Sequence, residues 1–243
     1  MSKTEKNYDC WICGEPAKTS EHKIKNSNLC SIFGNKVTQN SPLYYNDNQG
    51  KRDLKIGSTK NQHLTWLYTL CSKCNNERTQ PHDKAWDILF NAMHSRIPAI
   101  EKGTIIRNNK TFPYKTRQEM LNVHLFFVKL FGCRIVSEQI PINIESFSSS
   151  IINCKAHPYV FLKFGVFSSN YTSSIGGMSE INKSEIQGMN ELSIFHWYHR
   201  LDNLTVHVMF SSHNEWNILM DSWHPSHSTN NLKICNFNEP SQH

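Results

Sequence analysis

The stretches Cys10-Trp11-Ile12-Cys13 and Cys71-Ser72-Lys73-Cys74 decide the expected fold of this chain. Each holds two cysteines separated by two residues, and four such thiolates are the ligand set of a closed structural zinc site. The 57 residues between Cys13 and Cys71 exceed the spacing of a compact zinc ribbon, so we expect an insertion between the two pairs. Two other interpretations stay open: one pair is a redox motif and the other is inert, or all four are reduced core cysteines.

The residues around the cysteines predict short strands that connect them. A strand after the first pair is expected to reach His22, and the threonines, aromatics and leucines of residues 63–70 predict a strand that runs into Cys71. Residues 43–45 and 54–56 are expected to pair as a hairpin with its tip at Asn48-Gln49-Gly50. The inserted segment is therefore expected to carry a hairpin of its own.

A helix is predicted next, because five large apolar residues between Trp86 and Ile97 recur at helical spacing. Asp83 is expected as its N-cap and Pro98 as its end. A domain boundary is then expected near residue 112.

The second half predicts one more helix followed by strands. The helix is expected at 116–131, and the strands are expected at 134–144, 159–167, 194–198, 204–210, 216–220 and 232–237. We therefore predict an α+β protein. Its two parts are a zinc-braced unit in residues 1–112 and a β-rich accessory domain of unknown role in residues 113–243.

The positive charge is concentrated in the half that holds the cysteine pairs. The whole chain has a formal charge of +6, and residues 1–115 hold 18 Lys and Arg against 10 Asp and Glu, a net charge of +8. The remaining residues carry −2. A polyanion gains affinity for such a surface by counterion release, so the charge favours a nucleic-acid partner, although solvated surface lysine remains the simpler alternative.

The composition predicts a soluble cytoplasmic protein. No apolar run approaches 18 residues, which predicts no membrane span, and the polar start MSKTEKNYDC lacks the apolar segment of a signal peptide. In a reducing compartment, CxxC pairs indicate metal ligands or redox motifs before structural disulfides. The other four cysteines are expected to be buried or free thiols: Cys30, Cys133, Cys154 and Cys235.

The second half is rich in histidine. His196 and His199 have an i, i+3 spacing, and His224 and His227 repeat it. A second metal site is conceivable there, but no cysteine or carboxylate joins these pairs at a recognisable distance. The aromatic strands are more typical of a core.

The Glu21-His22 pair carries the candidate chemistry. An imidazole titrates near neutral pH and can take a proton from water, and a neighbouring carboxylate can bind a hard divalent cation. Such a cation neutralises the charge that builds up on a phosphate during hydrolysis. One base and one cation suffice for cleavage of a phosphodiester.

The combination of motifs resembles the HNH endonucleases. The resemblance rests on Cys10-x-x-Cys13, then Glu21-His22-x-Ile24, then Leu70-Cys71-x-x-Cys74-Asn75-Asn76-x-Arg78-Thr79, and it covers roughly residues 8–97. The tract CNNERTQPHDKAWD is similar to those of phage and prophage HNH proteins. The resemblance implies a treble-clef-like ββα-metal finger braced by a four-cysteine structural zinc, and it does not extend to residues 116–243.

The resemblance also implies roles for individual residues. His22 matches the general base, and Glu21 and Asn75 match the ligands of a catalytic Mg²⁺ or Mn²⁺. Arg78 takes the place of a basic residue near the phosphate. The central Asn of the motif has no decisive counterpart among Asn46, Asn48 and Asn61, and Asn61 is the one we choose.

Other residues near the motif have weaker assignments. Asp83 is either the helix cap or an additional metal ligand, and His82 is expected to be exposed or to contact DNA. Trp11 is expected to cover the zinc in preference to stacking on a base. Five basic residues are expected to position phosphates without reading sequence: Lys18, Lys23, Lys25, Lys73 and Arg78.

The sequence thus predicts a metal-dependent DNA endonuclease, with RNA left open as a substrate and the oligomeric state unknown. Two alternatives from other classes remain. One is a zinc-stabilised nucleic-acid-binding module without catalysis, and the other is a protein-interaction domain that uses zinc only for stability.

Overall fold

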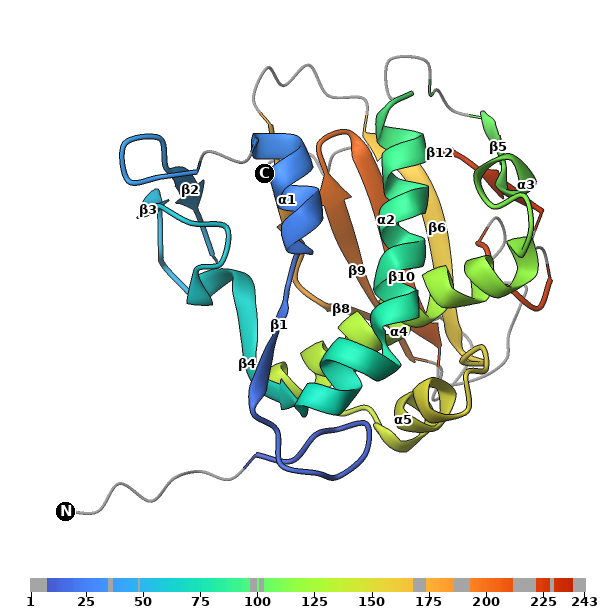
Figure 1. Ribbon diagram of the computed structural model, residues 1–243, viewed down its shortest axis with the longest axis horizontal. Helices are drawn as coiled ribbons and strands as arrows, with labels where there is room; N and C mark the ends of the chain where they lie inside the picture. The colour runs from blue at the N-terminus through green and yellow to red at the C-terminus, as the bar shows by residue number, and fades with distance from the viewer. Residues whose placement is uncertain are drawn as a thin grey trace.

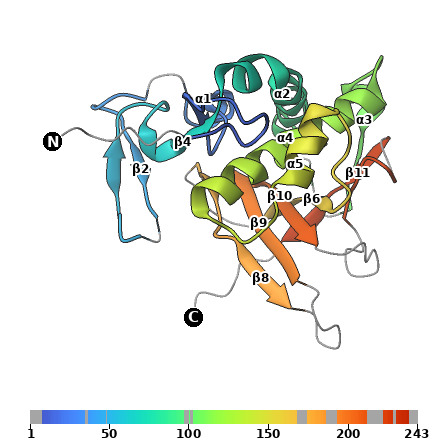
Figure 2. The same cartoon turned by 90° about the horizontal axis from the view of Figure 1, so that it is seen from below.

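The computed structural model describes residues 8–34, 37–47, 49–96, 100, 103–167, 174–185, 193–211, 222–227 and 230–237. It is a mixed α+β structure in which helices cover one face of a six-stranded sheet (Figures 1 and 2). The predicted strand at 216–220, the predicted turn residue Asn48 and the predicted helix end at Pro98 lie outside the described residues.

The sheet is built from the second half of the chain. Its strand order is β12-β6-β10-β9-β7, and β8 also pairs with β9. All pairings are antiparallel except β12 with β6. The strands are β6 (Val160–Phe167), β7 (Gly176–Met178), β8 (Asn182–Glu185), β9 (Ser193–Leu201), β10 (Leu204–Ser211) and β12 (Cys235–Phe237).

Helix α4 (Thr116–Glu138) is the centre of the helical layer. Nearly every residue from Met120 to Ile135 is buried, because α2, α5 and β4 pack around the helix and the sheet lies under it. Phe131 makes an edge contact with Trp197 of the sheet at 6.2 Å between ring centroids. The remaining helices are α1 (Asn26–Phe33), α2 (Gln80–His94), α3 (Asn108–Thr111) and α5 (Glu145–Ile152).

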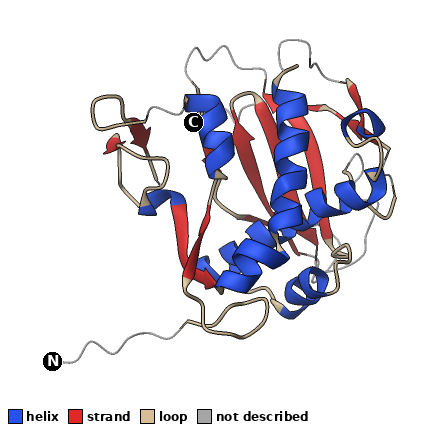
Figure 3. Cartoon of the chain, in the orientation of Figure 1, coloured by secondary structure: helices blue, strands red, loops and turns tan. Residues whose placement is uncertain are grey.

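The cysteine-containing half forms a strand pair that ends in a helix. Strands β1 (Thr19–His22) and β4 (Thr65–Leu70) are antiparallel, with Thr19 opposite Leu70 and His22 opposite Thr65. A short π-helical turn, η2 (Cys74–Arg78), then leads into α2. Figure 3 shows this β–β–α order beside the main sheet.

The expected insertion lies between β1 and β4. It contains α1, a separate hairpin and the one-turn helix η1 (Gln62–Leu64). The hairpin strands are β2 (Leu43–Tyr45) and β3 (Leu54–Ile56), paired as the sequence predicts. A further two-stranded sheet joins β5 (Ile105–Arg107) to β11 (Asn231–Lys233).

Several sequence-based expectations about helices and strands are wrong. Residues 134–144 do not form the predicted strand. Residues 134–138 continue α4, because Arg134 pairs with Glu138 one turn later and Ile135 enters the core, and residues 139–144 are turns and irregular chain. Helix α2 begins at Gln80 with Thr79 as its N-cap, so Asp83 lies inside the helix. The helices at 26–33 and 145–152 lie in stretches rich in serine or asparagine, for which the sequence predicts no helix.

The two halves share one hydrophobic core. Trp86 of α2 stacks on Phe126 of α4 with ring centroids 5.5 Å apart, and Trp11 of the first cysteine turn lies against Gly132 of α4. The boundary near residue 112 stays a prediction. Trp11 serves to attach the cysteine turn to α4, and its indole N–H donates to the Cys133 sulfur at 3.3 Å.

Helix α4 is long and apolar enough to cross a membrane, whereas no apolar run of that length is predicted from the sequence. However, 83% of its most apolar window is buried inside the protein. This burial is consistent with the core helix of a soluble protein.

The contact between Trp11 and Gly132 gives the first prediction. A Cβ added at Gly132 would lie 2.5 Å from the Trp11 ring, so we expect Gly132→Ala to lower the free energy of unfolding by about 1–3 kcal/mol. We expect this loss of stability although alanine has a higher helix propensity than glycine. Gly177→Ala is the control, because no atom lies within 4 Å of a Cβ there. Equal denaturation midpoints for the two variants would contradict the close contact.

The buried imidazole of His199 gives the second prediction. Neither of its ring nitrogens has a hydrogen-bond partner, and burial lowers its pKa from 6.5 to about 3. The folded state therefore favours the neutral ring, and stability falls as pH falls below 6.5, where the unfolded chain binds a proton first.

Between pH 7 and pH 5 this group should account for about 2 kcal/mol of lost stability. We expect urea titrations of His199→Leu to show a correspondingly smaller loss than the wild type. Parallel pH dependences in the two proteins would show that His199 is not held neutral by the fold.

Candidate functional site

The four cysteines of the two CxxC pairs come together at the base of the β1–β4 pair. Their sulfur atoms all lie within 4.8 Å of one another, and the Cys13 and Cys71 sulfurs are 3.6 Å apart. Backbone bonds hold the first turn, since the Gly14 N–H donates to the Cys10 carbonyl at 2.8 Å and the Lys18 N–H donates to the Leu70 carbonyl at 3.1 Å.

This arrangement confirms that the four cysteines are positioned to hold a metal ion. Three of the four are buried and Cys13 is exposed. Four convergent thiols without a disulfide fit a closed tetrahedral zinc site. The other four cysteines are free thiols as expected: Cys30, Cys133, Cys154 and Cys235.

His22 ends strand β1 and is half-buried. Its Nδ1 atom is buried without a hydrogen-bond partner. Burial lowers the pKa of the imidazole, and the positive charges of Lys129 and Lys60 lower it further. The fold therefore favours the neutral imidazole, and no protein group among the described residues satisfies its buried Nδ1.

Glu21, the neighbour of His22, is held in a buried group of charges. Its Oε1 atom lies 2.9 Å from the Nζ of Lys129, and the same Nζ lies 2.7 Å from Oδ1 of Asp83. The Lys129 side chain is only 1% exposed. Burial by itself would lower the Lys129 pKa, but the Asp83 and Glu21 carboxylates outweigh it and raise the pKa, so the amine stays charged.

Asn75 connects the helix start to strand β1. Its side-chain amide donates to the Thr19 hydroxyl at 3.1 Å and to the Ser20 carbonyl at 3.2 Å. Asn75 therefore fixes β1 relative to η2, immediately after the last cysteine.

Asn61, the predicted central Asn of the motif, caps the turn η1. Its side-chain oxygen accepts from the His63 N–H at 3.0 Å, and it makes no hydrogen bond to Nδ1 of His22. Its assignment to the motif stays a prediction.

The five predicted phosphate-binding residues differ in exposure and in whether their side chains already have a protein partner. Lys25 is bound to Asp87 and to the Asp83 carbonyl, and an Arg78 N–H donates to the Cys74 sulfur at 2.9 Å. Lys23 is half-buried, whereas Lys18 and Lys73 are exposed. Lys60 adds an exposed positive charge whose field reaches His22.

His82 is buried, contrary to the expectation that it is exposed or contacts DNA. Its Nδ1 lies 3.1 Å from Oδ1 of Asn122 on α4. Burial lowers its pKa to about 4. The early start of α2 explains the difference, because it turns His82 toward α4.

The histidine pairs of the second half do not form metal sites in the described part of the chain. His196 and His199 are three residues apart on a strand and so face opposite sides of the sheet. His196 instead meets His207 of β10 at 3.0 Å, and His224 is buried while His227 is exposed. Among the described residues, the four cysteines are the one group of three or more ligands close enough for a metal.

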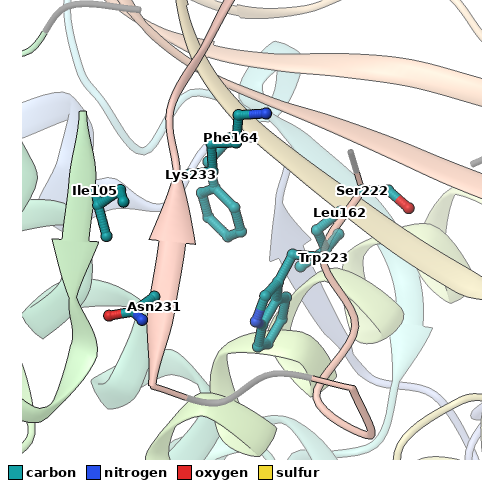
Figure 4. A pocket seen from close by; sticks show the side chains of 7 residues that line it. All are labelled: Ile105, Leu162, Phe164, Ser222, Trp223, Asn231 and Lys233. Atoms are coloured by element: carbon teal, nitrogen blue, oxygen red, sulfur yellow. The ribbon is translucent and has the colours of Figure 1, made fainter. Parts of the chain in front are cut away.

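A cavity of about 300 Å³ lies away from these residues, against the main sheet. Figure 4 shows Phe164, Leu162 and Trp223 on one side of it and Ile105 of β5 on the other. No residue of the β1–β4 pair lines it. The cavity therefore adds nothing to the chemistry of His22.

Sequence reasoning missed Lys129. The signal was present, because Lys129 is the one lysine in the apolar run from Met120 to Ile135. A lysine buried in a core helix requires carboxylate partners, and Glu21 and Asp83 were both recognised as chemically important. What the sequence lacked was the geometry that brings residues 21, 83 and 129 together.

The metal site gives the third prediction. We expect the purified protein to contain one zinc per chain by mass spectrometry of its metals, and Cys74→Ser to lose it and to unfold at a lower temperature. Cys154→Ser is the control, because Cys154 is exposed and outside the cluster. A wild-type protein free of metal, and equally stable with and without a chelator, would contradict the site.

No protein-family model, no curated protein and no solved structure matches this chain. A functional conclusion therefore rests on the residues and their geometry.

Proposed function

We propose that this protein is a zinc-stabilised nuclease of the HNH type that hydrolyses phosphodiester bonds in DNA, with His22 as the general base. The observation that supports this best is His22 itself: a neutral imidazole with an unpartnered ring nitrogen at the end of β1. The cysteine pairs, strands β1 and β4 and helix α2 follow one another along the chain in the order typical of a ββα finger, and His22 ends the first of these strands.

In the proposed reaction His22 takes a proton from water as the water oxygen attacks phosphorus. The bond from phosphorus to the 3′ oxygen breaks as this oxygen takes a proton from solvent water, leaving a 5′ phosphate and a 3′ hydroxyl, as the family resemblance implies. Lys60 supplies positive charge near His22, and exposed Lys18 and Lys73 hold the backbone of the nucleic acid on this half of the protein.

The family resemblance also implies a divalent cation at Glu21 and Asn75, and these residues do not fit one as they stand. The Glu21 carboxylate is paired with Lys129, and the Asn75 amide is bound to Thr19 and Ser20. We therefore assign no step to a metal at Glu21.

A second function, a nucleic-acid-binding module without catalysis, is favoured by that same ion pair. If Glu21 has lost its cation to Lys129, the finger keeps its zinc and its basic surface but lacks a metal to assist cleavage. Such a protein would bind DNA with a strong salt dependence and leave it intact.

The fourth prediction separates these functions. We expect the protein to nick or cut plasmid DNA in buffer with Mg²⁺ or Mn²⁺, and His22→Ala to reduce the rate by about 10²–10⁴-fold. The rate should rise with pH and level off by pH 7, because the His22 pKa lies below 6.5.

The control is His227→Ala, since His227 is exposed and far along the chain from the finger. Both variants must keep their zinc and their thermal unfolding temperature. Cleavage by His22→Ala at the wild-type rate would end the catalytic assignment. If the wild type and both variants bind DNA but none of them cleaves it, the binding module is favoured.

A further inference from the structure

The ammonium group of Lys129 lies between two carboxylates from the finger. It is 2.9 Å from Glu21 on β1 and 2.7 Å from Asp83 on α2. The Glu21 side chain is buried at 11% exposure and the Asp83 side chain is 19% exposed, whereas Lys129 approaches from inside at 1% exposure. A single cation thus bridges two acidic groups at the point where β1 and α2 converge.

Two carboxylates that converge on one point are hard-oxygen ligands of the kind that Mg²⁺ and Mn²⁺ prefer. An ammonium in that position satisfies their charge by hydrogen bonds and leaves little reason for a second cation to bind. A metal could enter only by displacing Lys129, which would leave the ammonium buried without a partner.

The surrounding charges act in the same direction. Lys25 donates to the Asp83 carbonyl at 2.7 Å and its positive charge also acts on Glu21. Its own partner is Asp87. Lys25 therefore adds positive potential at Glu21 to that of Lys129, although its ammonium group is paired with Asp87.

We propose that Lys129 is the resident cation of the Glu21–Asp83 pair. The wild-type protein then takes up no divalent metal there, and removal of the ammonium converts the pair into a divalent-cation site. The inference does not rest on the proposed nuclease activity, because it concerns occupancy of the carboxylates and is measured without DNA.

The fifth prediction uses Mn²⁺ as the probe on zinc-loaded protein, with bound Mn²⁺ measured by electron paramagnetic resonance. We expect Glu21→Gln to leave the weak Mn²⁺ binding of the wild type unchanged within about twofold. We expect Lys129→Met, which keeps an unbranched side chain one atom shorter and removes its charge, to bind one Mn²⁺ at least tenfold more tightly than the wild type.

Two matched variants locate the site. The double variant Lys129→Met with Glu21→Gln should lose the new Mn²⁺ affinity. Lys84→Met changes the net charge equally at an exposed position of α2 and should behave as wild type. Mn²⁺ should also raise the unfolding temperature of Lys129→Met and leave that of Lys84→Met unchanged, since the metal would replace the lost counter-charge.

Two results would overturn the proposal. One is Mn²⁺ binding to the wild type that Glu21→Gln weakens tenfold or more, which would mean that the carboxylate is already a metal ligand. The other is a folded, zinc-containing Lys129→Met that gains no Mn²⁺ affinity. Should Lys129→Met fail to fold, the comparison of wild type with Glu21→Gln still decides whether Glu21 is a metal ligand in the wild type. If the plasmid assay shows no cleavage, the nuclease proposal fails but the Mn²⁺ binding results still stand.

Discussion

The ion pairs of Lys129 connect parts of the chain that are far apart in sequence. Glu21 comes from the first strand, Asp83 from the first turn of α2 and Lys129 from the middle of α4. Charges this deeply buried are costly unless each is paired, so β1, α2 and α4 are constrained to one mutual arrangement. Trp11 adds a second constraint, because its ring fits only where α4 has a glycine. The position of His22 follows from both.

The cysteine cluster acts at the other end of the same strand pair. It joins the turn before β1 to the turn after β4, and Asn75 carries this link to the start of the helix. A strand pair of only a few residues on each side is marginal alone. Here the sulfurs close one end and the Lys129 ion pairs fix its inner face. An imidazole at the open end can therefore keep a fixed orientation without a hydrogen bond of its own.

Local sequence was sufficient for much of the fold. The CxxC pairs, the strand that ends at His22, the hairpin at 43–45 and 54–56, and the main strands β6, β9 and β10 all follow from spacing and alternation of residue type. The errors arose where distant contacts override local preference. Gly132 normally suggests a helix end, but Trp11 packs against it and α4 continues. The sequence around Asp83 predicts a helix cap, but its carboxylate instead pairs with Lys129. His82 is expected on the surface, but its ring is buried and meets the side chain of Asn122.

The order of these elements along the chain has a consequence for synthesis on the ribosome. All four cysteines are made before α4, so a nascent chain could gather its sulfurs while Glu21 and Asp83 still lack their counter-charge. During that interval the two carboxylates repel each other, and the Trp11 ring lacks the surface of α4 against which it packs. The cysteine-containing unit can therefore reach its final form only after the segment that contains Gly132 and Lys129 leaves the exit tunnel, so its maturation follows the synthesis of α4.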